Sequence, residues 1–236
     1  MAKKVEGKLY ESLTGQLFEI GRQLRQKNGY PFNPAMLQKH LQDAIVGKFS
    51  PAKNSQSEVF TEWKKFYQKL FNRDFDFSNI AIPEKSEGNW RLLIIADIPL
   101  EALYAKCKEQ FPCWRWTDDD LGKIVNWNER DAKNGAYAIW VRDDVEADES
   151  LKNLSAESIK TRSIATETLA ERLIHELKFF DETGNHLDIQ NVTLCAGSRD
   201  SDGGVPGVRW YGGKLRVYWY VPDSAGGSLR ARLVVS

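Results

Sequence analysis

The feature that most constrains the fold of this chain is a run of alternating apolar and polar residues near the C-terminus, at 214–220 (KLRVYWY). One set consists of Leu215, Val217 and Trp219, and the other of Lys214, Arg216, Tyr218 and Tyr220. Because successive side chains of a β-strand point to opposite faces, the run predicts a strand with one buried and one exposed row. The Gly212-Gly213 pair before it, itself preceded by Val208–Tyr211, predicts the two-residue turn of a β-hairpin. Tyr and Arg are favoured at binding interfaces, so the exposed row indicates a recognition surface.

Residues 1–78 are predicted to form an N-terminal helical region. Apolar residues recur there at steps of three and four, which places them on one face of a first helix: Leu9, Leu13, Leu17, Ile20 and Leu24. Asn33-Pro34 supplies an N-cap residue and a proline for the start of a second helix. A third helix begins at Ser57-Glu58 and has an aromatic side. This region holds 13 basic and 8 acidic residues, a net charge of +5.

A different pattern follows residues 79–88, which are predicted to be a linker or domain entry. Short runs rich in β-branched and aromatic residues predict strands at 90–96, 136–141, 191–195 and 229–235. Helices are predicted at 99–110 and 155–162 and from residue 169, with Gly184 as the C-terminal capping residue of the last. The predicted fold class is α+β, with residues 89–236 forming one domain.

Composition narrows the possible partners. Thirty-three basic residues balance 33 acidic ones, so the charge of the whole chain does not indicate a nucleic-acid or anionic-membrane partner. No apolar segment is long enough to span a bilayer, and no apolar signal segment follows the basic N-terminus, so we expect a cytoplasmic protein with no membrane contact. Three cysteines, an odd number, argue against a disulfide scaffold.

Motifs of catalysis and of metal binding are not found in the sequence. Asp118-Asp119-Asp120 lacks the spacing of an EF-hand, and His175 lacks the second histidine of the zinc-protease motif. Gly197-Ser198 lacks the remainder of a nucleophile elbow, and the glycine pairs are not phosphate-binding loops. We therefore expect a protein that is not an enzyme, with no catalytic residues, no metal and no cofactor.

The last part of the chain resembles the variable proteins of diversity-generating retroelements, which have the C-type lectin fold of the formylglycine-generating-enzyme type. That family carries an Arg-Gly-Gly-Ser-Trp motif, then loops rich in Asn, Asp and Gly, and finally Gly-Phe-Arg. Here residues 195–199 (CAGSR) stand at the position of the Arg-Gly-Gly-Ser-Trp motif, and residues 229–234 (LRARLV) stand at the position of Gly-Phe-Arg. Residues 128–148 also resemble uncharacterised relatives of this type, and the resemblance covers roughly 88–236. Arg199 stands where the family has Trp, and no cysteine pair matches the catalytic cysteines of the true enzymes.

The resemblance implies a C-type-lectin-like domain with a mixed or antiparallel sheet and two or more helices. It also implies a variable region at 195–236 that displays a hypervariable, ligand-binding surface. Adenine-directed mutagenesis of Asn codons does not yield Glu, Gln, Met or Lys. Residues 195–236 contain no Glu, Gln or Met and a single lysine, Lys214. The ligand would be a protein or another macromolecule, of unknown identity.

The variable region divides into two predicted sets. The scaffold set, expected to be buried or geometrically fixed, is Gly197, Val205, Pro206, Trp210, Leu215, Val217, Trp219, Pro222, Leu229, Arg230 and Arg232. The ligand-binding set, expected to face solvent, is Asp200, Asp202, Gly204, Gly207, Arg209, Tyr211, Arg216, Tyr218, Tyr220, Asp223, Ser224, Gly226, Gly227 and Ser228.

Two alternatives stay open at this point. The chain could be a nucleic-acid-associated protein that uses the basic N-terminal helices, in which case binding should weaken steeply with salt. It could also be an enzyme on the same fold, which would require a pocket of convergent polar groups.

Overall fold

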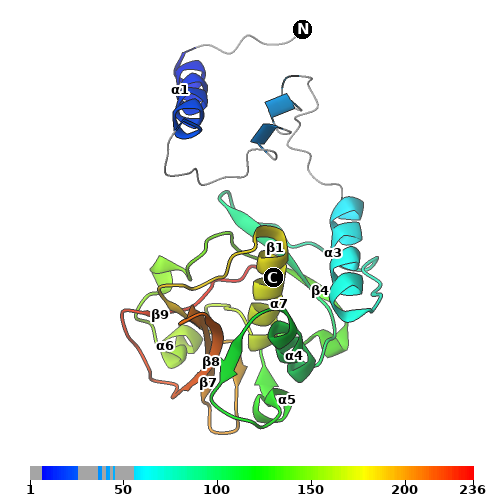
Figure 1. Ribbon diagram of the computed structural model, residues 1–236. Helices are drawn as coiled ribbons and strands as arrows, with labels where there is room; N and C mark the ends of the chain where they lie inside the picture. The colour runs from blue at the N-terminus through cyan, green and yellow to red at the C-terminus, as the bar shows by residue number, and fades with distance from the viewer. Residues whose placement is uncertain (1–6, 26–36, 39–40, 43–44, 46–55) are drawn as a thin grey trace. The chain divides into compact units, whose positions relative to one another are not determined.

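A computed structural model describes residues 7–25, 37–38, 41–42, 45 and 56–236 (Figure 1). The chain divides into two units, 1–56 and 57–236. In the first, α1 (Lys8–Gln23) confirms the first predicted helix. Most of the second predicted helix lies outside the described residues. Among the described residues, no helix is long and apolar enough to cross a membrane.

Helix α3 (Gln56–Phe71) corrects the predicted domain boundary. The sequence placed this helix in the N-terminal region, yet nearly all of it lies in the second unit. Its residues Trp63, Phe66 and Tyr67 are buried in the main core. The buried Tyr67 hydroxyl also donates a hydrogen bond of 2.7 Å to the carbonyl of Ile94. The boundary is therefore at 56/57 rather than at 78, because the aromatic side of α3 is needed to cover the core.

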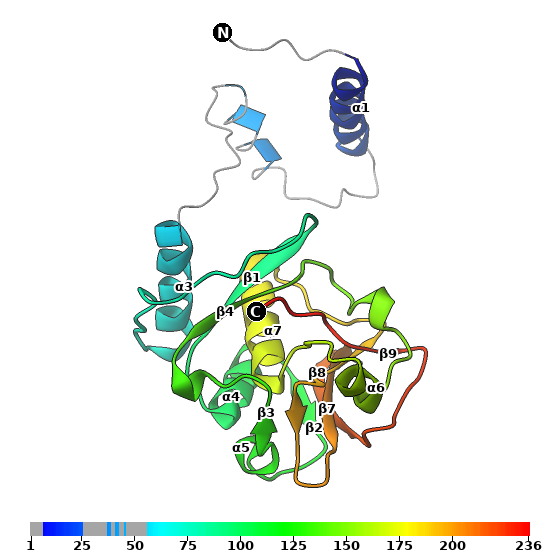
Figure 2. The ribbon, with the colours of Figure 1, turned by 180° about the vertical axis from the view of Figure 1, so that it is seen from behind.

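The second unit is α+β, as predicted. Strands β1 (Trp90–Ile95) and β4 (Tyr137–Arg142) form an antiparallel ribbon in which Leu93 lies opposite Ile139. The main helices are α4 (Leu100–Gln110) and α7 (Leu169–Thr183), and α5 (Leu121–Ile124) and α6 (Ala156–Thr161) are shorter. Figures 1 and 2 show α7 in the middle of this unit, and its residues contact α4, β1 and β7.

A mixed five-stranded sheet carries the C-terminal region. Its order is β2-β8-β7-β5-β9, where β2 is Cys113–Arg115, β5 is Val192–Leu194, β7 is Val205–Tyr211, β8 is Lys214–Tyr220 and β9 is Leu229–Arg230. The β2–β8 and β5–β9 pairs are parallel, and the two pairs that involve β7 are antiparallel. A second small ribbon joins β3 (Trp127–Asn128) to β6 (Ser198–Arg199).

The predicted last strand, 229–235, is too long. Strand β9 ends at Arg230, and the chain then makes single bridges from Leu233 to Thr166 and from Val235 to Trp140. The interruption coincides with Arg232, whose side chain is fully buried and hydrogen-bonds to Asp188. The C-terminal segment thus leaves the sheet to deliver a charged side chain to the interior.

Helix α7 has the ends that its sequence predicts. Thr168 and Glu171 form a capping box at its start, and Gly184 adopts the left-handed conformation (φ 70°) at its end. Its apolar residues Leu169, Leu173, Ile174 and Leu177 are buried. The helix also buries ionisable residues that the sequence analysis did not identify: Glu171, Arg172, His175, Glu176 and Lys178.

Candidate binding surface

The β7–β8 hairpin is formed as predicted. Tyr211 lies opposite Lys214, and Gly212 and Gly213 make the two-residue turn between them. Both glycines have positive φ, 61° and 73°, which is the geometry of a type I′ turn. That turn fixes the register, so each residue of β8 has a defined neighbour on β7.

The inner row of β8 is buried, as the alternation predicted. Leu215 and Val217 have no exposed surface and belong to the main core. Trp219 is half-buried, and its ring stacks on Trp116 with centroids 4.7 Å apart. These contacts hold the outer row in place, because any shift of the strand by one residue would expose the core side chains.

The outer row is less exposed than predicted. Lys214 is exposed, but Arg216, Tyr218 and Tyr220 are half-buried. Tyr220 packs against a small apolar cluster of Val192, Leu194 and Leu229. The outer row is thus a fixed surface, with rings held at one edge, rather than a set of free side chains.

Strand β2 adds a residue that the sequence analysis missed. Trp114 lies beside Arg216 in the parallel register of β2 and β8, and its ring centroid is 5.4 Å from that of Tyr218. It keeps 40% of its surface exposed. The alternation of 113–116 (CWRW) could have indicated a strand, but only the pairing of β2 with β8 places Trp114 on this surface.

Arginines and aromatic rings interleave on this face of the sheet. The guanidinium of Arg209 lies 4.6 Å from the centroid of the Tyr211 ring, and that of Arg216 lies 5.4 Å from the same centroid. Arg216 also lies 5.7 Å from the ring centroid of Trp114. We call this set the outer sheet face; it consists of Trp114, Arg209, Tyr211, Lys214, Arg216, Tyr218 and Tyr220.

Gly204 and Gly207 do not face solvent, so the prediction for these two positions is wrong. Both are buried. A Cβ at Gly204 would lie 2.2 Å from Nε1 of Trp219, and one at Gly207 would lie 2.5 Å from Cε2 of Tyr220. The two glycines therefore belong to the scaffold, because neighbouring rings occupy the space that a side chain would need.

The other predicted ligand-binding residues lie in two loops. Loop 200–204 precedes β7 and loop 221–228 follows β8, so both adjoin the end of the hairpin where Val205 pairs with Tyr220. Asp202, Asp223, Gly227 and Ser228 are exposed, whereas Ser224 and Gly226 are half-buried. The half-buried Asp200 has a structural role, since its Oδ1 accepts hydrogen bonds from the amides of Asp202 and Gly204.

The predicted scaffold set is buried or partly buried throughout. Fully or nearly fully covered members are Gly197, Val205, Pro206, Leu215, Val217, Leu229 and Arg232, and the partly covered ones are Trp210, Trp219, Pro222 and Arg230. At Gly197 a Cβ would lie 2.8 Å from the carbonyl oxygen of Thr166, which leaves no room for a side chain.

Behind the sheet lies a buried charged cluster centred on Asp188. Its Oδ2 accepts hydrogen bonds from Arg172 (2.8 Å) and Thr193 (2.6 Å), and its Oδ1 accepts one from Arg232 (2.8 Å). Burial by itself would raise the pKa of Asp188, but Arg232 and Arg172 outweigh it and hold the pKa below its ordinary value. The cluster joins α7, β5 and the C-terminal segment through charge-assisted hydrogen bonds.

His175 and Glu167 form a second buried pair, with His175 Nδ1 2.9 Å from Glu167 Oε1. Burial raises the pKa of Glu167 to about 7 and lowers the pKa of His175 well below its usual value. Burial also raises the pKa of the nearby Cys195 thiol. These groups resemble parts of a catalytic site, but His175, Glu167 and Cys195 are at most 1% exposed and out of reach of a substrate.

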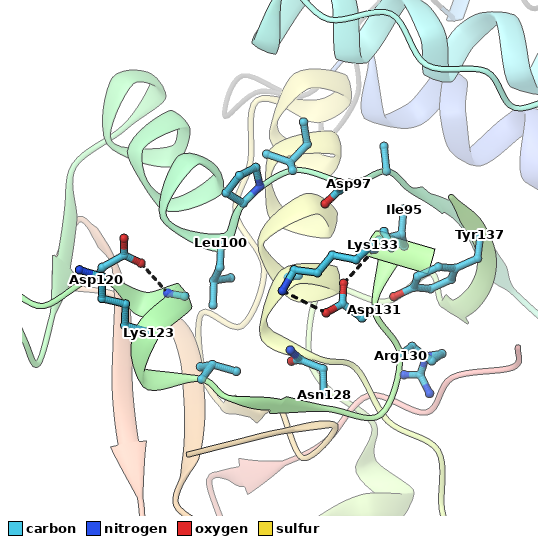
Figure 3. A pocket seen from close by; sticks show the side chains of 17 residues that line it. Ile95, Asp97, Leu100, Asp120, Lys123, Asn128, Arg130, Asp131, Lys133 and Tyr137 are labelled. Atoms are coloured by element: carbon cyan, nitrogen blue, oxygen red, sulfur yellow. Dashed lines mark hydrogen bonds and ion pairs between the residues drawn. The ribbon is translucent and has the colours of Figure 1, made fainter. Parts of the chain in front are cut away.

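A cavity of about 340 Å³ lies between the loop after β1, helix α5 and segment 128–133 (Figure 3). Most of its charged groups already have partners. Asp120 caps α5 through the amide of Gly122, the Arg130 guanidinium binds both carboxylate oxygens of Glu171, and Lys133 Nζ lies 3.6 Å from the Asp131 carboxylate. The described residues that line it include no Cys, Ser, Thr or His. This cavity can admit a small polar molecule, and its polar lining consists of Asp, Asn, Lys, Arg and Tyr side chains.

A second cavity of about 540 Å³ borders the variable region. Trp127, Ile159 and Ile164 form its apolar part, and Arg199 and Asp200 lie at its polar part. Among the described residues, no group of three or more His, Cys, Asp or Glu side chains is arranged to hold a metal ion.

Comparison of the chain with protein-family models, with curated proteins and with solved structures gives no match in any of the three.

Proposed function

We propose that this protein binds a macromolecular ligand, most simply another protein, through the outer sheet face and the two loops beside it. One observation carries the proposal: the hairpin separates a buried row, which maintains the fold, from an outer row of Arg and Tyr, and β2 places Trp114 beside that outer row. Arg, Tyr and Trp are the residues enriched at binding hot spots. Held on a hairpin with a fixed register, these side chains are ordered before a ligand arrives, which lowers the entropic cost of binding.

We further propose that the second unit is a C-type-lectin-like domain whose region 195–236 is diversified by a retroelement. The mixed sheet with packed helices is compatible with such a domain, and so is the return of Val235 to pair with Trp140. The absence of Glu, Gln and Met from 195–236 fits adenine-directed mutagenesis. We also propose that the chain is not an enzyme, since its catalytic-type pair, His175 and Glu167, is closed off from solvent.

The genomic test of this proposal compares genes of sibling strains and their surroundings. We expect a nearby reverse transcriptase, together with a near-copy of the 3′ end that differs at adenines. Substitutions should gather at Arg209, Tyr211, Arg216 and Tyr218 and at the loop positions 201–203 and 223–228. Gly204 and Gly207 should stay unchanged, because no side chain fits there. Changes spread evenly over buried and outer positions would contradict the proposal.

The biochemical test replaces Tyr211 and Tyr218 together by Ser. Tyr211 is exposed, Tyr218 is half-buried, and neither belongs to a buried apolar cluster, so this variant should fold and lose less stability than a core variant. A matched variant replaces Leu215 and Val217 of the inner row by Ala and should lower the free energy of unfolding by several kcal/mol, because a Leu→Ala change in a core by itself costs about 2–5 kcal/mol. Equal destabilisation by the two variants in urea denaturation would show that the outer row is structural and would remove the basis of the proposal.

A further inference from the structure

Three cations lie at one end of the outer sheet face. Arg209 and Arg216 are paired in register, and Lys214 pairs with Tyr211 next to the turn. Their hydrogen bonds go to neutral groups: Arg209 to the carbonyl of Ile189, and Arg216 to the carbonyl of Tyr211. Within residues 56–236, none of the three forms an ion pair with a carboxylate, whereas the partly exposed Arg91, Arg115 and Arg230 each form at least one.

Two exposed carboxylates lie in the loops at the opposite end of the hairpin. The loops beside Tyr220 carry the exposed Asp202 and Asp223. A strand of seven residues rises by about 3.4 Å per residue, so roughly 20 Å separates the two ends. This distance exceeds the Debye length of about 8 Å at physiological salt, so the two ends act as separate charged patches. The tyrosines Tyr218 and Tyr220 lie between them.

From this charge separation we infer that the ligand is a protein that docks a short acidic segment. Its carboxylates contact Arg209, Lys214 and Arg216 near the hairpin turn, and an adjoining apolar or aromatic part contacts Trp114 and Tyr218. The inference deepens the proposed function and rests on it. Arginine is suited to this role, because its planar guanidinium donates two parallel hydrogen bonds to one carboxylate.

A nucleic acid fits this face less well. Three cations neutralise about three phosphates, fewer than the roughly 6–10 contacts of proteins whose DNA binding depends strongly on salt. A polyanion that continued along the strands would also meet Asp202 and Asp223. A short acidic segment avoids that repulsion, because its charge is confined to one end of the face.

The experiment selects a displayed library of random peptides on the full-length protein. A second selection uses a variant with Arg209→Glu and Arg216→Glu. The control variant, Lys64→Glu with Lys65→Glu, has the same change in net charge at exposed positions of α3, a helix that is not part of the outer sheet face. Circular dichroism verifies that each variant is folded, and Arg209→Gln with Arg216→Gln replaces the reversed variant if it is not.

We expect peptides selected on the wild type and on the control to be enriched in Asp and Glu, and those selected on the reversed variant to lose that enrichment. A representative acidic peptide should bind the reversed variant about tenfold more weakly or worse, which corresponds to about 1.4 kcal/mol. Peptides without acidic enrichment would overturn the inference. So would a DNA duplex or anionic vesicles that bind more tightly than the peptides and are lost with the same two arginines.

A third variant separates this inference from the proposed function. If the selected peptides are not acidic but lose binding when Tyr211 and Tyr218 are replaced by Ser, the surface is right and only its charge preference is wrong. If the peptides are insensitive to both the tyrosine and the arginine changes, they bind elsewhere, and the proposed function fails together with the inference.

Discussion

At the scale of single residues, glycines decide which positions of the variable region can change. Gly207 and Gly227 both lie in that region, yet their surroundings differ completely. The Tyr220 ring and the Val192 side chain lie within 3.0 Å of the place of a Cβ at Gly207, and nothing lies within 4 Å of the corresponding place at Gly227. Packing therefore requires a glycine at position 207, whereas the space around position 227 would accept a side chain.

We predict that Gly207→Ala lowers the free energy of unfolding by about 1–3 kcal/mol, the usual cost of overpacking. The matched change Gly227→Ala should cost about 0.5 kcal/mol or less, because this glycine is exposed. Urea denaturation of both variants measures the difference. If the two variants prove equally stable, Tyr220 does not rest on Gly207 as described.

Glu167 makes stability depend on pH at the residue scale. Its pKa is raised by burial from 4.5 to about 7, so the folded state holds this proton more tightly than the unfolded state. The stability that it contributes is fully present below about pH 4.5 and is lost as the pH rises through 7. His175 has the opposite effect on stability. Its pKa is lowered in the folded state, so it stabilises that state at pH values above 6.5, the ordinary pKa of histidine.

We predict that Glu167→Gln removes the loss of stability that ionisation of Glu167 causes as the pH rises. Between pH 5 and 8 the wild type should lose stability relative to the Gln variant, by an amount on the order of 3 kcal/mol if the whole shift is realised. Chemical denaturation of both proteins across this range gives the two curves. Parallel curves would mean that Glu167 is already ionised at pH 5.

At the scale of secondary-structure elements, Asp188 connects parts of the chain that are far apart in sequence. It binds Arg172 of α7, Thr193 of β5 and Arg232 beyond β9. All four side chains are buried, so each charge depends on the others for compensation. The sheet that carries the outer face is thereby fixed to the central helix.

We predict that Asp188→Asn destabilises the protein by about 3–5 kcal/mol, the usual effect of leaving buried charges without their counter-charge. Asp223→Asn, the same chemical change at an exposed loop position, should be nearly neutral. Thermal unfolding followed by circular dichroism compares the two. A small effect at Asp188 would indicate that water or Glu176 compensates the arginines.

At the scale of the whole molecule, α3 belongs to the unit that carries the outer sheet face. We predict that a chain beginning at residue 57 unfolds cooperatively with a free energy close to that of residues 57–236 in the full protein. A chain beginning at residue 79 removes Trp63, Phe66 and Tyr67 from the core and should be several kcal/mol less stable, since burying one large apolar side chain contributes about 1.5–3 kcal/mol. Equal stability of the two chains would restore the boundary at 78.

Part of the fold can be predicted from the sequence alone, because the patterns that specify it involve residues close together in the chain. The alternation at 214–220 and the Gly212-Gly213 turn specify the hairpin and its two rows, and the capping residues of α7 specify its ends. Each of these depends on neighbours within a few residues. The same local rules separated Leu215 and Val217 from Arg216 and Tyr218 correctly.

Other features were decided only by the tertiary structure. Trp114 joins the outer sheet face through a parallel pairing across about a hundred residues of chain, and Gly207 is buried because of how the Tyr220 ring lies. Arg172 and Arg232 enter the core only because Asp188 meets them there. Side-chain periodicity reports which face a residue occupies within its own element. It carries no information about which distant element covers that face, and that is what determined these three outcomes.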